Sequence, residues 1–223
     1  MDVGTGSSLE PRLPLALYRL HFVAAGPVRL PYYSGSTWRG VLGHALRRLV
    51  CVTQLPVCAD CALVHACAHS YLFETPPPQG TEKMRKYPAV PHPFVLQPPE
   101  GIVELPEGAP YALDLTLVGH ANRQLPYLLH ALERAGERGV GRGRTPLQML
   151  KTERREHLDH GGWQEIHRPG APIVNQSVGP VQIPPTPGKG LRIEFLKPLR
   201  LRRSGRPIRP DDFDFVDLFS NLL

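Results

Sequence analysis

The chain has 223 residues, of which 41% are hydrophobic, and this is enough to bury one large core or two small ones. Its formal charge of +6 favours an acidic partner such as a nucleic acid over a neutral one. The first ten residues have neither the basic nor the apolar region of a secretion leader, and no apolar run is long enough to cross a bilayer. We therefore expect a soluble cytoplasmic protein, in which the four cysteines are not paired as structural disulfides.

Alternating and helical patterns predict the first two elements. From Leu13 to Ala25 every second residue is apolar, which indicates a strand with one buried face. Ser36 or Thr37 can cap a following helix that has one apolar stripe. Because each helical residue advances about 100° around the axis, the opposite face is polar. That polar face consists of Gly40, His44, Arg47 and Arg48.

Four more elements follow a cysteine-rich insert. They are an extended segment near Phe94 to Leu96, a strand at Tyr111 to Gly119, a helix capped by Asn122 over residues 125–135, and a strand from Thr145 to about Lys151. The order strand, helix, strand, strand, helix, strand is that of a ferredoxin-like, or RRM-like, module. The predicted fold class is therefore α+β.

This order also predicts the domain organisation. Residues 1–156 form the first ferredoxin-like module and include the cysteine-rich insert at residues 51–92, while residues 157–189 are a connector rich in proline and glycine. Residues 190–223 then contribute a basic strand over 191–201 and a helix after Asp211, the start of a second module. Because this second module is incomplete, we expect its apolar side chains to be covered by the first module, by another copy of the chain or by a partner subunit.

The polar face of the first helix carries groups that can cleave RNA. Metal-independent cleavage needs a base for the 2′-hydroxyl, an acid for the leaving 5′-oxygen and positive charge near the phosphorane. His44, with Arg47 or Arg48 one turn along, can supply these groups. An exposed helix with an unrelated histidine explains the same residues.

Two basic segments are candidates for RNA binding. In the Gly-Arg segment, residues 136–144, glycines alternate with Arg138, Arg142 and Arg144, so that backbone and guanidinium groups can approach phosphates. A charged turn after a helix is the alternative. The second segment, residues 192–209, contains Arg200, Arg202 and Arg203 and only one acidic residue before residue 209. The segment is either a surface that binds the phosphates of RNA or a solvated strand and loop.

Four cysteines gather within seventeen residues. Cys51, Cys58, Cys61 and Cys67 are the only cysteines of the chain, and the two-residue spacing of the central pair is typical of a metal-binding knuckle. We predict a structural metal, with zinc favoured over an iron-sulfur cluster. His65 and His69 are substitute ligands if Cys51 stays in the helix. Free thiols packed in a small subdomain are the alternative.

Together these segments resemble the RAMP superfamily of CRISPR systems, and within it the precursor-crRNA-processing endoribonucleases. The resemblance is carried by GSTWRGVLGHALRRLVC, by the four-cysteine insert continuing into SYLFETPPP, by YPAVPHPFVLQPP, by LTLVGHANRQLPYLLHALERAGERGVGRGR and by DFDFVDLFSNLL. It implies two tandem ferredoxin-like modules, binding of CRISPR repeat RNA, and cleavage without a catalytic metal that leaves a 2′,3′-cyclic phosphate.

The resemblance also suggests roles for individual residues. His44 matches the position at which family members often have a catalytic histidine, and Tyr33 and Arg48 are its candidate partners. Arg39 and Arg47 join the arginines above as candidate RNA ligands. The glycine-rich loop that closes complete family members has no counterpart in the sequence, so the chain resembles a C-terminally incomplete member. The alternative function is a non-catalytic RAMP subunit that binds guide RNA among the subunits of a CRISPR effector complex.

Overall fold

The protein forms two compact units, Met1–Gln182 and Ile183–Leu223. The structure is a computed structural model. It describes residues 13–77, 90–157, 161–174, 177–179, 181, 188, 190, 192–195, 199–203 and 205–222, with only the backbone described at 219–222.

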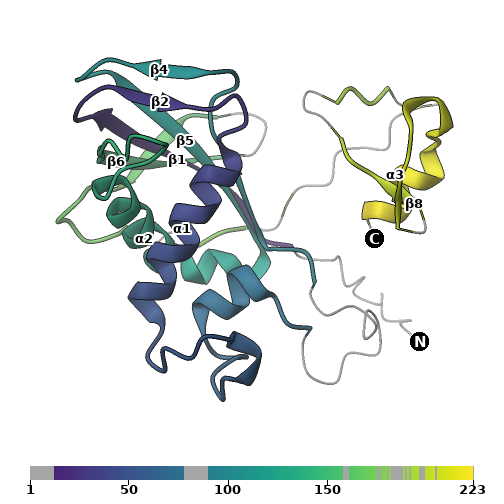
Figure 1. The fold of residues 1–223 in the computed structure, drawn as a ribbon, viewed down its shortest axis with the longest axis horizontal. Helices are drawn as coiled ribbons and strands as arrows, with labels where there is room; N and C mark the ends of the chain where they lie inside the picture. Colours follow the sequence, from purple (N-terminus) through teal and green to yellow (C-terminus); the bar gives the residue numbers. More distant parts are fainter. Residues whose placement is uncertain are drawn as a thin grey trace, which may run out of the picture. The chain divides into compact units, whose positions relative to one another are not determined.

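A five-stranded antiparallel sheet is the centre of the first unit (Figure 1). Its strands are β1 (Leu15–Ala24), β3 (Phe94–Gln97), β5 (Pro110–Val118), β6 (Leu147–Arg155) and β7 (Trp163–His167). They lie in the order β3-β5-β1-β6-β7, and each neighbouring pair is antiparallel. The first four strands have the order of a ferredoxin-like module, which confirms the predicted fold class. The fifth, β7, lies inside the segment predicted to be a connector.

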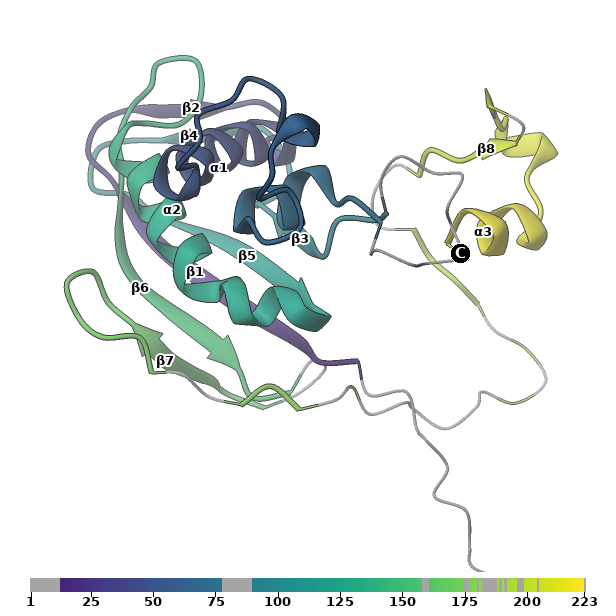
Figure 2. The ribbon, with the colours of Figure 1, turned by 90° about the horizontal axis from the view of Figure 1, so that it is seen from below.

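Two helices cover one face of this sheet (Figure 2). In the chain, helix α1 (Gly35–Val50) lies between β1 and β3, and α2 (Leu125–Glu137) lies between β5 and β6. The alternation of β1 directs Tyr18, Leu20 and Phe22 into the core, where each is at most 1% exposed. Burial of these side chains against both helices removes apolar surface from water, which is the main force that holds the layers together.

Short elements complete the unit. Strand β2 (Val28–Leu30) pairs with β4 (Val103–Leu105), and three-residue strands are too short for alternation to reveal them in a sequence. The cysteine-rich insert contains the 3₁₀ turn η1 (Cys58–Asp60) and η2 (Ser70–Glu74), which is a π-helix. A further 3₁₀ helix, η3 (Gly119–Gln124), precedes α2.

Both predicted helix caps are wrong. Helix α1 begins before Ser36 and Thr37, with Ser34 at its N-cap, so both predicted residues lie inside the helix. Asn122 lies in η3, and its amide donates to the Gly119 carbonyl at 3.0 Å. The reason is local: the 3₁₀ helix delays the start of α2 to Leu125, which leaves Asn122 to fix the preceding turn.

The second unit contains little regular structure. It consists of the two-residue strands β8 (Arg202–Arg203) and β9 (Arg206–Pro207), the turn η4 (Pro210–Asp212) and α3 (Phe215–Leu222). The predicted strand over 191–201 is absent from those of its residues that the structure describes. Pro198 gives a physical reason, because proline cannot donate to a strand ladder.

The helix of this unit leaves apolar side chains in solvent. Phe215 is 63% exposed and Val216 is 67% exposed, whereas Leu218 is buried. Phe219, another apolar residue of this helix, has no described side chain. Of the helices in the described part of the chain, none combines the length and the apolar character that a bilayer crossing requires.

Candidate functional site

The polar face of α1 is the first candidate site. His44 and Arg48 are exposed one turn apart, as predicted from the helical period. Arg47 differs from them in that it makes hydrogen bonds within the protein. Its guanidinium donates to the Leu55 carbonyl and, at 3.1 Å, to the Pro56 carbonyl. Arg47 therefore ties α1 to the cysteine-rich insert, while His44 and Arg48 face solvent.

Tyr33 lies at the other end of this helix. Its ring is 63% exposed and meets the ring of Tyr32 edge-on, with centroids 4.8 Å apart. Helix α1 begins at Gly35, and His44 comes nine residues later. With a rise of about 1.5 Å per residue, Gly35 and His44 lie roughly 14 Å apart along the helix axis. The structure thus groups His44 with Arg48 and places Tyr33 apart from them.

A second face of α1 packs against the π-helix η2. The guanidinium of Arg39 lies over the ring of Phe73 at 5.2 Å and over that of Phe94 at 5.3 Å. A Cβ at Gly43 would meet the Phe73 ring at 3.0 Å, so the absence of a side chain permits this close approach. Arg39, a predicted RNA ligand, is therefore engaged in a cation-π contact within the protein.

The π-helix shapes a metal-ligand group. Its hydrogen bonds join residues five apart, as the Thr75 amide does when it donates to the Ser70 carbonyl at 2.8 Å. In an α-helix, residues five apart point about 140° away from each other, but the wider π turn brings them to one side. His69 and Glu74 are five residues apart and share this side.

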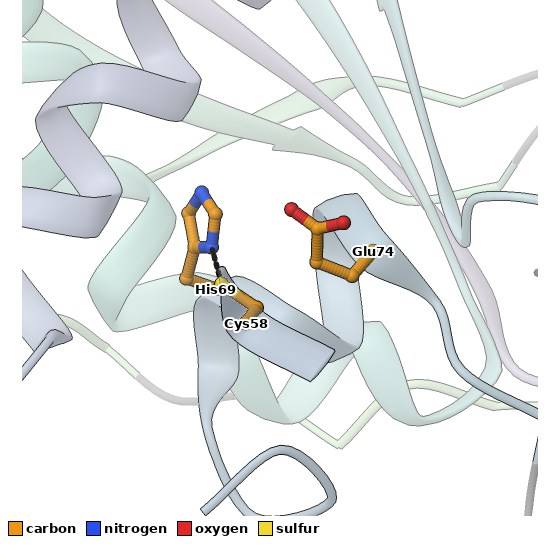
Figure 3. Close-up of side chains that lie close together, drawn as sticks. All are labelled: Cys58, His69 and Glu74. Carbon is orange, nitrogen blue, oxygen red and sulfur yellow. Dashed lines mark hydrogen bonds between the residues drawn. The ribbon is translucent and has the colours of Figure 1, made fainter. Parts of the chain in front are cut away.

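Cys58 completes this group, which we call the Cys-His-Glu triad (Figure 3). The Cys58 Sγ lies 3.9 Å from the His69 Nδ1, and the ligand atoms of all three residues are within 4.8 Å of one another. Thiolate, imidazole and carboxylate are all zinc ligands in proteins. The triad is therefore compatible with a structural zinc ion, and His69 is one of the two predicted substitute ligands.

The protonation chemistry of the triad also suits a metal. Burial lowers the pKa of the His69 imidazole, an effect opposed by Glu74 and reinforced by Arg47, so the ring is biased toward the neutral form that binds metals. Burial and the Glu74 carboxylate raise the pKa of the Cys58 thiol. A bound cation would reverse this by stabilising the thiolate.

The other three cysteines lie around the same place. All four line one cavity of about 430 Å³ together with His69. Among the described residues, the triad is the only group of three or more such side chains that lies close enough to hold an ion. No three of the four cysteine sulfur atoms form a second group of this kind. Sequence reasoning missed Glu74, because a π turn has no spacing signal that distinguishes it from an α-helix.

The Gly-Arg segment forms a tight turn after α2. Val140 bridges Thr145, and Arg138, Arg142 and Arg144 are all exposed, as a phosphate-binding role requires. Gly139 has a φ of +89°, and a Cβ there would lie 1.9 Å from the Arg144 carbonyl oxygen. Only glycine fits this position.

The remaining predicted RNA ligands belong to the second unit. Arg200 and Arg202 are exposed, and Arg203 donates to both carboxylate oxygens of Asp217, through its Nε at 2.7 Å and through its Nη2. This pair joins β8 to α3, so the guanidinium of Arg203 has a structural partner within its own unit.

The fold and the site define an α+β protein with a ferredoxin-like module and a metal-compatible insert. A family model named AF_1859_N, described as an N-terminal domain, matches residues 13–192. This match covers most of the chain, so the chain belongs to that family, which is a family of CRISPR-associated proteins. None of the curated proteins matches the chain.

Proposed function

We propose that this protein is a CRISPR RNA-processing endoribonuclease of the RAMP superfamily. It binds the repeat RNA of a precursor crRNA and cleaves it without a catalytic metal. The observation that carries the proposal is the exposed pair of His44 and Arg48 on α1, in a ferredoxin-like module of a CRISPR-associated family. The net charge of +6 is consistent with an RNA ligand.

The proposed chemistry is an internal transesterification. The 2′-oxygen attacks the neighbouring phosphorus, the bond from phosphorus to the 5′-oxygen breaks, and the products are a 2′,3′-cyclic phosphate and a 5′-hydroxyl. His44 acts as the general base that takes the 2′-proton or as the acid that protonates the leaving oxygen. The Arg48 guanidinium, one turn along the helix, stabilises the charge that develops on the phosphorane.

The Cys-His-Glu triad has a structural part in this proposal. A zinc ion would be held by Cys58, His69 and Glu74, with one of the other three cysteines as the fourth ligand. The metal would fix the insert against α1, where Arg47 already connects the two. It takes no part in the cleavage.

A non-catalytic role is the second candidate. The observation that favours it is that Tyr33 precedes the first residue of α1, Gly35, whereas His44 lies roughly 14 Å further along the helix axis than Gly35. In this case the protein binds guide RNA as a RAMP subunit of a CRISPR effector complex. RNA binding is common to both candidates, and cleavage distinguishes them.

The test is cleavage of labelled repeat RNA by the purified chain in excess EDTA. The endoribonuclease produces a single cut with a 2′,3′-cyclic phosphate end, which acid treatment converts to a monophosphate. The zinc content is measured in parallel, so that loss of a structural metal is not mistaken for loss of a catalytic one. Binding without cleavage by zinc-loaded protein would support the non-catalytic subunit.

A further inference from the structure

A cavity of about 700 Å³ opens at the end of α1 that is opposite to the cysteine-rich insert. Four segments meet there: the end of β2, the first turn of α1, the residue before β4 and the Gly-Arg segment. Figure 1 shows α1 beginning beside the β2 and β4 pair, and Figure 2 shows the same proximity from another side. The lining residues are Arg29, Leu30, Tyr32, Thr37, Ile102 and Arg142, together with Pro31 and Gly141.

Glycine geometry fixes the Gly-Arg segment against β2. Gly141 has a φ of +79°, and a Cβ there would lie 2.7 Å from the Arg29 carbonyl oxygen. The hydroxyl of Thr145 donates to the Pro27 carbonyl at 2.7 Å and holds the other end of the turn to the same region. The segment is thus held in place, and it presents the exposed Arg142 at the cavity.

The lining combines positive charge with exposed flat or apolar side chains. Tyr32 is 56% exposed and Ile102 is 62% exposed. Arg29 and Arg142 are the charged members of the lining, which includes no acidic residue among those described. Glu104 lies just outside and pairs with Arg29 at 3.1 Å between largely exposed side chains, so Arg142 is the stronger source of positive potential.

We propose that this cavity binds one nucleotide of single-stranded RNA, with the base stacked on Tyr32 and a phosphate held by Arg142. An aromatic platform beside an arginine is how proteins bind unpaired nucleotides, because every base has a stacking face and every nucleotide carries a phosphate. The charge of the lining favours RNA over an apolar protein segment. The ligand class rests on the proposed function, whereas the location rests on the cavity itself.

The stacking contact is tested by fluorescence anisotropy with labelled repeat RNA at one fixed salt concentration. Replacing a stacking aromatic residue by alanine costs about 1–3 kcal/mol per base, so Tyr32→Ala weakens binding by roughly 5- to 150-fold. Tyr32→Phe keeps the ring and binds within about twofold of the wild type. Equal affinity of Tyr32→Ala and wild type would overturn the stacking contact.

The phosphate contact and the turn have matched controls. Arg142→Ala weakens binding and makes it less dependent on salt, whereas Arg134→Ala, an exposed arginine of α2 outside the cavity, does neither. Gly141→Ala displaces the turn and weakens binding, whereas Gly179→Ala, at a glycine outside the Gly-Arg segment where a Cβ would meet nothing within 4 Å, leaves binding unchanged. Equal effects within each pair would contradict the proposal.

Photocrosslinking gives a readout that does not depend on the folding of variants. Wild-type protein irradiated with repeat RNA that contains 4-thiouridine should yield a crosslinked peptide containing Tyr32 or Arg142. Crosslinks confined to other peptides would overturn the cavity as a binding site while the proposed function stands. Failure of wild-type protein to bind RNA by either method would overturn the proposed function and, with it, the ligand named here.

Discussion

The sheet module and the cysteine-rich insert are stabilised in different ways. The sheet with α1 and α2 buries apolar side chains throughout, and many of them have no exposed surface. Between residues 51 and 77, the buried side chains are Leu72 and three polar ones, His69, Ser70 and Thr75. Apolar burial is therefore the main force that stabilises the sheet, whereas the insert needs bonds between polar groups. A metal on the Cys-His-Glu triad would supply them.

The largest expected effect is the removal of this metal. The protein should carry about one zinc per chain, and because binding of a structural zinc contributes on the order of 10 kcal/mol in small domains, Cys58→Ser should release it. In hydrogen exchange, amides of the insert then exchange faster while those of β1 and β5 do not. Asp60→Asn, which changes an exposed carboxylate outside the triad, is the control and should retain the metal.

Either of two results would contradict this account of how the insert is stabilised. If protein prepared without chelator contains no metal, or if Cys58→Ser retains it, the insert is held by something other than the triad.

A core substitution in the sheet should have the next largest effect. Leu113 on β5 has no exposed surface, so Leu113→Ala should lower the free energy of unfolding by about 2–5 kcal/mol. Denaturant titration measures this change. The zinc content of the folded variant should stay unchanged, because the three residues of the triad lie in the insert and not on the sheet. A variant that keeps its stability but loses zinc would reverse the assignment of roles.

Two glycines sharpen the account of packing on the sheet. At Gly136 in α2, a Cβ would lie 2.3 Å from the Leu147 carbonyl oxygen, so Gly136→Ala should destabilise the fold by about 1–3 kcal/mol. At Gly40 in α1, a Cβ would meet nothing within 4 Å, so Gly40→Ala should stabilise it by about 0.5–1 kcal/mol. Thermal unfolding compares the pair, and shifts of the same sign would contradict the packing described here.

The smallest expected effect concerns pH. Hydrogen bonds from Lys151 at 2.5 Å and from His21 at 2.7 Å lower the pKa of the Glu153 carboxyl below its usual value of 4.5. A lowered pKa stabilises the fold above pH 4.5, and this contribution is lost as the pH falls through the folded-state pKa. Glu153→Gln should therefore lose less stability between pH 7 and pH 3 than the wild type does. An identical loss in both proteins would show that Glu153 makes no such contribution.

The same contrast explains what the sequence could predict. The β1 strand and the two helices have long apolar patterns, and the resulting element order specifies the ferredoxin-like sheet. Three-residue strands such as β2 carry too few side chains for a pattern. Two of the three triad residues were visible, because Cys58 and His69 belong to a recognisable group of Cys and His residues, whereas Glu74 joins them through a π turn that has no spacing signal.

The site on α1 was predictable for a similar reason. The helical period alone places His44 and Arg48 on one exposed face. The internal contacts of Arg39 with Phe73 and Phe94 were not predictable, since they depend on how the insert folds back on the helix. The identity of the ligand is a chemical question that neither period nor packing decides.

The most direct test of the central claim is the single-turnover cleavage rate of repeat RNA by His44→Ala. Removing one general acid or base should lower this rate by about 10²- to 10⁴-fold, while RNA affinity stays within about twofold. His130→Ala, which removes an exposed histidine of α2, should cleave at the wild-type rate. Cleavage by His44→Ala at the wild-type rate would contradict the proposal that this histidine carries the chemistry.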